Sequence, residues 1–209
     1  MIIIGGMIGI GKTTTASILQ KETGLPTYFE SVEGNEVLPL FYKANKEEKE
    51  RYRYPFLLQM SFLRSRFHTI KEASKHQNAI MDRSIFEDYY FAKKNHELGN
   101  INDMEMKIYE SFLNEILDST KNDNAVMIYL HGKFDTVLER IKTRGRDFEL
   151  SQSLVSYYRF LYDGYDKIIK DNYKDEHLID IDVDKIDLLN NKKDLLSLLE
   201  ELKQRSFLK

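Results

Sequence analysis

Gly6-Met7-Ile8-Gly9-Ile10-Gly11-Lys12-Thr13 is the stretch that decides the fold of this chain. It follows the apolar run at residues 1–4 and precedes a helix-forming segment, residues 14–20. In the pattern G-x-x-x-x-G-K-T, glycines let backbone N–H groups converge on phosphate oxygens, and the helix N-terminus adds its dipole. The lysine reaches the β- and γ-phosphates, and the threonine hydroxyl can ligate Mg²⁺.

This pattern predicts a site for a nucleoside triphosphate. The alternative is a glycine-rich turn with an unrelated lysine, which would not need a strand before it and a helix after it. The loop alone leaves hydrolase, switch and kinase open. The residues expected at the phosphates are Gly6, Gly9, Gly11, Lys12, Thr13 and Thr14.

The composition is that of a folded protein. With 209 residues, of which 42% are hydrophobic, the chain can bury a full core, so we expect a single domain over residues 1–209. A net charge of −3 argues against a dominant nucleic-acid surface, and no apolar run approaches the roughly 20 residues of a membrane span. The absence of cysteine excludes disulfides and thiolate chemistry. We expect a cytoplasmic protein with neither a nucleic-acid nor a membrane partner.

Short apolar segments alternate with helical patterns. Buried parallel strands are predicted at residues 2–4, 27–29, 79–81, 126–130 and 178–181. Apolar residues recur at helical spacing in residues 56–70, 85–91, 104–117, 134–141, 154–169 and 195–202. The alternation predicts an α/β fold, a five-stranded parallel sheet flanked by helices, with ligands at the carboxyl ends of the strands. The charge run at residues 43–53 is interpreted as a solvated connection.

Charged residues follow the second and third predicted strands. Glu30 is a candidate base that accepts the proton of an acceptor hydroxyl and aligns its oxygen, with Glu33 as the rival carboxylate. Asp82 is placed to hold Mg²⁺ directly or through water, and Arg83 to neutralise charge near the transferred group. The competing interpretations are a surface glutamate at a strand end, and a structural Asp–Arg pair before an N-capping Ser84.

Three arginines follow the fourth predicted strand. Arg140 and Arg144 are spaced i, i+4 and share a helix face, and Gly145 breaks the helix before Arg146. Guanidinium groups at a helix end can close over phosphates as a lid. The alternative is the ordinary preference of a helix C-terminus for cations, which does not require an arginine cluster of this density.

A polar pair lies on the stretch 56–70. Gln59 and Arg66 are seven residues apart and share one helix face, with Phe62 between them. On an otherwise apolar, aromatic face, the pair predicts a pocket for a flat ligand, because glutamine can bond a base edge through two atoms. Asp88, in the next predicted helix, is placed to orient Arg66. Solvated edge residues are the alternative interpretation.

Together these motifs resemble the deoxyribonucleoside kinase family, in particular its bacterial deoxyadenosine/deoxyguanosine kinase branch. The phosphate loop is shared with many families, whereas the Asp-Arg-Ser and Arg-Gly-Arg-x-x-Glu elements are far more specific. The matching elements are residues 6–14, 30–32, 40–42, 56–59, 82–88 and 140–149. The resemblance implies a P-loop kinase fold with an Arg-rich lid, ATP as donor, Mg²⁺, and a homodimer packed through residues 36–75 and 84–97.

The resemblance also assigns roles on the donor side. Glu30 is similar to the family's general base on the 5′-hydroxyl, with Arg83 beside it and Lys12 as a further catalytic residue. Thr13 and Asp82 are the implied metal residues, although the family often has glutamate where this chain has the shorter Asp82. The donor's base is expected against the Arg144 region and residues 182–187, under the lid of Arg140, Arg144 and Arg146.

On the acceptor side, Tyr42 and Glu149 resemble the pair that binds the sugar 3′-hydroxyl, and Gln59 the residue that contacts the base. Arg66 and Asp88 match the pair found in members that take purine deoxynucleosides or deoxycytidine. The chain departs from the family at Ser31, where many relatives have proline, and at Phe62, whose bulk would narrow the base pocket.

The expected activity is transfer of the γ-phosphate of ATP to the 5′-hydroxyl of a deoxyribonucleoside, a small-molecule substrate. Deoxyadenosine and deoxyguanosine are expected first, with deoxycytidine as a further candidate. A nucleoside monophosphate kinase of the thymidylate type shares the loop and the Arg lid, but a carboxylate at Glu30 would repel its acceptor phosphate. A nucleotide-dependent switch would need no acceptor pocket at Gln59.

Overall fold

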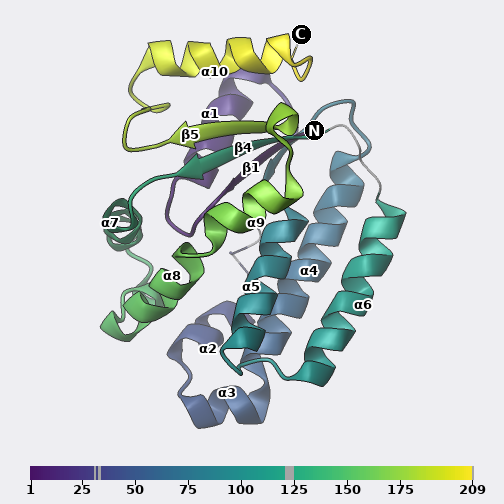
Figure 1. Ribbon diagram of the computed structural model, residues 1–209, viewed down its shortest axis with the longest axis vertical. Coiled ribbons are helices and arrows are strands. Elements are labelled where there is room, and N and C mark those ends of the chain that lie inside the picture. The colour runs from purple at the N-terminus through teal and green to yellow at the C-terminus, as the bar shows by residue number, and fades with distance from the viewer. Residues whose placement is uncertain (31, 33, 121–124, 209) are drawn as a thin grey trace.

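Five parallel β-strands form one sheet in the order β2-β3-β1-β4-β5. Their bounds are β1 (Ile2–Gly6), β2 (Thr27–Tyr28), β3 (Ile80–Asp82), β4 (Val126–His131) and β5 (Leu178–Asp182). Figure 1 shows the sheet in the computed structural model of the chain, which describes residues 1–30, 32, 34–120 and 125–208. The predicted strands are confirmed, each with ends displaced by at most two residues.

The register of the sheet brings the site together. Ile4 on the central strand β1 lies opposite Asp82 on β3 and Ile128 on β4. β1 is buried along its whole length, as expected for an apolar strand covered on both faces. Because the strands are parallel, the carboxyl ends of β1 and β3 meet at one edge, where the phosphate loop begins.

Helices cover both faces of the sheet (Figure 1). Their bounds are α1 (Lys12–Thr23), α2 (Val37–Lys43), α3 (Lys46–Tyr52), α4 (Tyr54–Ala73), α5 (Ile85–Glu97), α6 (Asp103–Ser119), α7 (Phe134–Arg144), α8 (Val155–Tyr162), α9 (Tyr165–Asn172) and α10 (Lys192–Gln204). The chain turns back across the sheet after β2, so right-handed crossovers place α1 on one face and α4 on the other. Helices α5 and α9 lie on the α4 side, and α10 on the side of α1 (Figure 1).

Two predictions about helices were wrong. Residues 154–169 do not form one helix, because the chain breaks between α8 and α9 at Asp163 and Gly164. Gly164 packs so closely on another helix that a Cβ atom there would lie 2.5 Å from the Tyr90 hydroxyl. The charge run 43–53 is not a simple connection either, since it contains α3, which begins with a capping box of Asn45 and Glu48.

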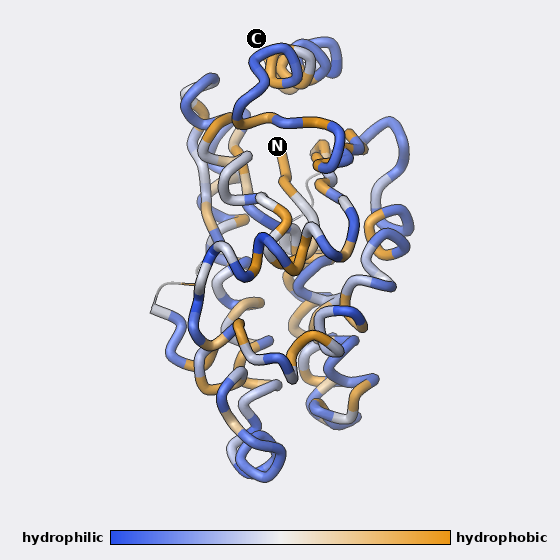
Figure 2. Tube along the Cα trace, turned by 90° about the vertical axis from the view of Figure 1, so that its left-hand side faces the viewer, coloured by the Kyte–Doolittle hydropathy of each residue, from blue (hydrophilic) through white to orange (hydrophobic). Residues whose placement is uncertain are grey.

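The helix α3 is solvated along its whole length, and none of its residues is buried. In Figure 2 it is the hydrophilic turn at the foot of the molecule, whereas the trace of α10 at the top is coloured hydrophobic along one side. The neighbouring α2, which the sequence pattern did not predict, buries Leu38 and Phe41 against Leu58 of α4. This small second cluster forms a wall beside the site. Within the described part of the chain, no helix has both the length and the apolarity to cross a membrane.

Candidate active site

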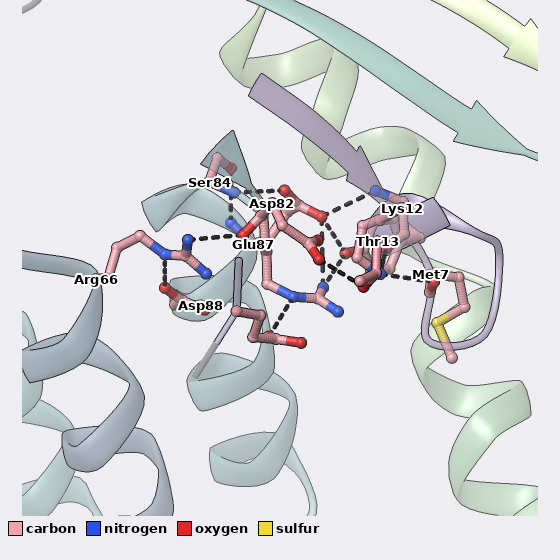
Figure 3. A network of polar contacts seen from close by, with 12 residues as sticks. Met7, Lys12, Thr13, Arg66, Asp82, Ser84, Glu87 and Asp88 are labelled. Carbon is pink, nitrogen blue, oxygen red and sulfur yellow. Dashed lines mark hydrogen bonds and ion pairs between the residues drawn. The ribbon is translucent and has the colours of Figure 1, made fainter. Parts of the chain in front are cut away.

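The phosphate loop connects β1 to α1 as the sequence predicts. Gly6 has φ 143° and packs so tightly that a Cβ atom would lie 2.4 Å from the Leu130 carbonyl oxygen. Gly11, at the N-terminus of α1, has φ 111°. Both positions therefore require glycine. The Lys12 ammonium donates to the carbonyl oxygens of Gly6 (2.8 Å) and Met7 (3.0 Å), which ties the loop to its own helix (Figure 3).

Lys12 is buried, and this perturbs its charge. Burial lowers the pKa of its ammonium and the positive charge of Arg83 lowers it further, against the opposing effect of nearby carboxylates, so that the pKa falls to about 8. Negative phosphate oxygens at the loop would favour the charged form and raise this pKa again. A bound anion would therefore stabilise the charged form of Lys12.

Thr13 and Asp82 meet where α1 begins and β3 ends (Figure 3). The Thr13 hydroxyl donates to Asp82 Oδ2 at 2.7 Å, and the carboxyl group is almost fully buried. Oδ1 of Asp82 is buried without a hydrogen-bond partner among the described residues. A hydroxyl and one or two carboxylate oxygens, completed by phosphates and waters, are the ligand set that Mg²⁺ takes in kinases, so these residues fit a magnesium ion.

Glu30 and Arg83 form an ion pair at the edge of the cavity. Arg83 Nε donates to Glu30 Oε1 at 2.7 Å, and the Glu30 side chain remains 20% exposed. Burial alone would raise the pKa of Glu30, but the charges of Arg83 and Lys12 outweigh it and lower the pKa to about 2. Glu30 is therefore an ionised hydrogen-bond acceptor at neutral pH. Ser31 and Glu33, named in the sequence predictions, lie outside the described residues.

Arg66 of α4 and Asp88 of α5 form a buried pair, with Arg66 Nε 2.7 Å from Asp88 Oδ2. Arg66 also donates through Nη1 to the Asp82 carbonyl oxygen at 2.8 Å, so it connects the pair to the end of β3 (Figure 3). Gln59 is 3% exposed, and its Oε1 is buried without a partner among the described residues. Gln59 and Asp88 line the cavity together with Phe62, whereas Arg66 supports Asp88 from behind.

The three arginines of the predicted lid lie where the sequence places them, at the end of α7 and just beyond it. Arg140 donates through Nη1 to the Ile10 carbonyl oxygen of the phosphate loop. Arg144 and Arg146 both pair with the buried Glu149, at 2.5 Å and 3.4 Å. The lid and the loop are therefore in direct contact through Arg140.

Glu149 and Tyr42 face the same cavity. The Tyr42 ring stacks on Phe148 with centroids 5.5 Å apart, and burial is the main cause that raises the pKa of its hydroxyl well above the ordinary value. Tyr42 thus keeps its proton at neutral pH and can donate a hydrogen bond. In this structure Glu149 is engaged by the lid arginines, which the sequence prediction for this carboxylate did not include.

One cavity of about 1240 Å³ joins these groups. It extends from the phosphate loop and α1 to the α4–α5 face at Gln59 and Asp88, and to the segment after β5, residues 183–190. Typical clefts for one small molecule measure roughly 300–1000 Å³, so the cavity has room for two ligands. It offers an anion site at one end and a hydrogen-bonding, aromatic pocket at the other.

The sequence predictions missed Glu87 as a site residue. It is fully buried and bonds the first loop residue, Gly6 N–H, at 2.9 Å, the hydroxyl of Tyr165 and the guanidinium of Arg83. The available signal was the spacing of Ser84 and Glu87, typical of a capping box. That spacing predicts the start of α5 but not the contacts with distant segments.

The sequence of this chain is similar to the sequences of known deoxynucleoside kinases. A sequence model described as deoxynucleoside kinase matches residues 2–208. A deoxyadenosine kinase of Lactobacillus acidophilus is 35% identical over 98% of this chain and 95% of its own length. A deoxyguanosine kinase of the same organism is 34% identical over 97% of this chain and 89% of its own length.

Solved structures of a deoxyadenosine kinase from M. mycoides share the fold. The structure with the products dCMP and a flexible dCDP has a TM-score of 0.81 at 28% identity, covering 97% of this chain and 98% of that chain. The structure with bound dATP has a TM-score of 0.79 over the same shares. The loop, the lid and the pocket thus lie in a P-loop kinase fold, and the chain belongs to the deoxynucleoside kinase family.

Proposed function

We propose that this deoxynucleoside kinase transfers the γ-phosphate of ATP to the 5′-hydroxyl of a purine deoxyribonucleoside, deoxyadenosine before deoxyguanosine, with deoxycytidine as a further candidate. One observation carries the proposal. The cavity that begins at the phosphate loop ends at Gln59, whose buried Oε1 lacks a partner among the described residues. A buried unpaired acceptor costs stability, so its presence indicates a ligand that donates a hydrogen bond there.

The donor phosphates lie on the loop amides and Lys12, with the lid arginines over them. Arg140, Arg144 and Arg146 supply positive charge that stabilises the phosphates. As a lid, the same segment excludes water from the site. Mg²⁺ would be held by Thr13 and Asp82, and its charge would offset that of the donor phosphates. The placement of residues 183–190 along the same cavity supports a donor base in that region.

The acceptor hydroxyl lies beside Glu30. With a pKa of about 2, Glu30 is a weak base, so its main contribution is to accept the hydrogen bond that aligns the 5′-oxygen. In a loose phosphoryl-transfer transition state the hydroxyl proton leaves late, when the oxygen has become acidic, and an ionised carboxylate then suffices to take it. Arg83 neutralises charge on the transferred group.

The nucleoside is held at its base and its sugar. The Gln59 side chain bonds the base edge, and Asp88, held by Arg66, offers a second polar contact. Tyr42 and Glu149 bind the 3′-hydroxyl, for which Glu149 must share its oxygens with the lid arginines. Each good two-atom contact with a base discriminates by about 1–3 kcal/mol, so these groups support a preference of one to a few decades.

The test is to incubate the protein with ATP, Mg²⁺ and each of the four deoxynucleosides, dAMP and dTMP in parallel. We expect deoxyadenosine monophosphate as the main product. No product from any deoxynucleoside would overturn the proposal, and phosphorylation of dTMP alone would favour the monophosphate kinase.

Glu30→Gln should keep nucleoside binding and lose most of kcat. Normal turnover in Glu30→Gln with loss in Glu33→Gln would show that the other carboxylate acts.

We also propose that the protein is a cytoplasmic homodimer. The resemblance implies a dimer contact through residues 84–97, which contain α5. This helix packs against α4, α6 and α9 within the same chain, so we place the dimer contact on a neighbouring helix. Apolar side chains are instead exposed in a row on α6, at Met104, Ile108 and Phe112. This row supports a dimer contact on α6 beside α4.

A further inference from the structure

Glu87 accepts hydrogen bonds from groups on separate segments of the chain. Its Oε1 accepts from the Gly6 N–H at 2.9 Å and from the Tyr165 hydroxyl at 2.6 Å, while Oε2 accepts from the Ser84 N–H at 2.7 Å. Arg83 Nη1 lies 3.4 Å from Oε1. The carboxylate has no exposed surface and lies between the loop and the Arg66–Asp88 pair (Figure 3).

Helix capping does not explain these contacts. The capping box of α5 uses Oε2 of Glu87 on the Ser84 amide, and this is all that a capping box requires. Helix α3 has the same box, formed by Asn45 and Glu48 on the surface, and among the described residues Glu48 bonds only within that box. The second oxygen of Glu87 is therefore not needed for the cap and is available for contacts with other segments.

That second oxygen constrains Arg83. Arg83 has φ 78°, an uncommon backbone conformation for a residue other than glycine, and its guanidinium carbon lies 4.8 Å from the Phe91 ring centroid. Nε donates to Glu30 at 2.7 Å and Nη1 to the Tyr165 hydroxyl at 2.7 Å. Among the described residues Nη2 has no hydrogen-bond partner, and Arg83 lines the cavity. The guanidinium is thus fixed on two nitrogens and has one left for a ligand.

The same oxygen also constrains the phosphate loop. Gly6 donates its N–H to Glu87, and its carbonyl oxygen accepts from Lys12. One buried carboxylate therefore connects two parts of the site. These are the loop that carries the donor phosphates and Arg83, which pairs with Glu30.

We propose that Glu87 and Tyr165 are positioning residues for phosphoryl transfer. They hold the phosphate loop and Arg83 in one fixed relation, so that the γ-phosphate and the 5′-hydroxyl are aligned in the closed site. The inference rests on the proposed kinase reaction. Neither residue is among the described residues that line the cavity; Glu87 acts through Gly6 and Arg83, and Tyr165 through Glu87 and Arg83. Since catalysis of phosphoryl transfer is mainly positioning and charge stabilisation, loosening this connection should slow the chemical step more than it weakens binding.

The deciding variant is Tyr165→Phe, which removes one hydroxyl and keeps the ring that packs on Tyr90 and Tyr129. We expect kcat to fall roughly 10-fold or more, while KM for deoxyadenosine and for ATP stays within about 3-fold. Glu87→Gln, which presents an amide N–H to groups that are themselves donors, should fall roughly 100-fold in kcat if it folds. Glu48→Gln is the matched control in an exposed capping box and should keep full activity.

A double-mutant cycle separates positioning from a purely structural role. In an Arg83→Lys background the Tyr165→Phe change should have much less effect on kcat, because the guanidinium that the hydroxyl holds is gone. Equal effects in both backgrounds, or wild-type kcat in Tyr165→Phe, would overturn the inference while leaving the kinase function standing. Wild-type protein that phosphorylates no deoxynucleoside would overturn the proposed function itself.

Discussion

The Lys12 ammonium is buried, and it donates to two backbone carbonyl oxygens. Around it lie Arg83, whose charge disfavours a second cation, and Asp82 and Glu30, whose charges favour it. The net result is a lysine whose pKa, about 8, is depressed from the ordinary 10.5. A triphosphate on the loop adds negative charge next to the ammonium and reverses this shift.

Binding of ATP should therefore take up protons in mildly alkaline solution. With a pKa of about 8, Lys12 is roughly three-quarters neutral at pH 8.5 and almost fully charged at pH 6.5. Titration calorimetry at pH 8.5, in two buffers of different ionisation enthalpy, should show an uptake approaching three-quarters of a proton, and almost none at pH 6.5. Lys12→Arg stays charged at both pH values and is the control. An equal uptake in that variant would assign the protons to another group.

At this scale the sequence indicated which residues gather around the cavity better than it indicated the contacts between them. The spacing of Gly6, Lys12 and Thr13 alone indicates the anion site, because its mechanism is local. Glu87 was missed as a site residue because its decisive partners, Gly6 and Tyr165, are 81 and 78 positions away in the chain. The engagement of Glu149 by Arg144 was missed although the residues are close in sequence, because it depends on how the chain turns after Gly145.

At the scale of elements, buried periodic segments were predicted well. Every strand and the long helices carry a continuous or periodic apolar pattern that the core enforces. The two failures have different causes, one local and one tertiary. Helix α3 has no apolar face, so only its Asn45–Glu48 capping box marks it, and residues 154–169 have an apolar period that continues across a break set by another helix.

The break between α8 and α9 should be sensitive to the size of residue 164. A Cβ atom in Gly164→Ala would lie 2.5 Å from the hydroxyl of Tyr90, which donates to the Leu161 carbonyl oxygen at 2.6 Å. We expect Gly164→Ala to lower the free energy of unfolding by about 1–3 kcal/mol, measured by urea denaturation.

Tyr90→Phe tests the cause of that loss. Alone it should cost about 0.5–1.5 kcal/mol, because the hydrogen bond to the Leu161 carbonyl is lost. Combined with Gly164→Ala it should cost less than the sum of the two single changes, since the atom that clashes has been removed. Strict additivity would show that contact with the Tyr90 hydroxyl is not the cause of the loss in Gly164→Ala.

At the scale of the whole molecule, the cavity is built from segments that are far apart in sequence: the loop after β1, the face of α4 and α5, the lid after α7 and the segment after β5. No cavity-lining residue in the described part of the chain belongs to α6. One face of α6 packs on α4 and α5, and Met104, Ile108 and Phe112, spaced four residues apart, are 66%, 41% and 54% exposed on another. A row of apolar side chains of this kind indicates a protein contact.

Phe112→Asp should therefore convert the proposed dimer into monomers. A carboxylate in an apolar contact carries a desolvation cost without a partner, so we expect the dimer dissociation constant to rise at least about 100-fold, measured by sedimentation. Leu196→Asp, at a residue of α10 that is 48% exposed, is the matched control and should stay dimeric. Because α6 contributes no described residue to the cavity, the monomer should retain kcat at saturating substrate. Loss of kcat in parallel with dissociation would mean that the second subunit stabilises the catalytic geometry, and a wild-type monomer would remove the dimer from the proposal.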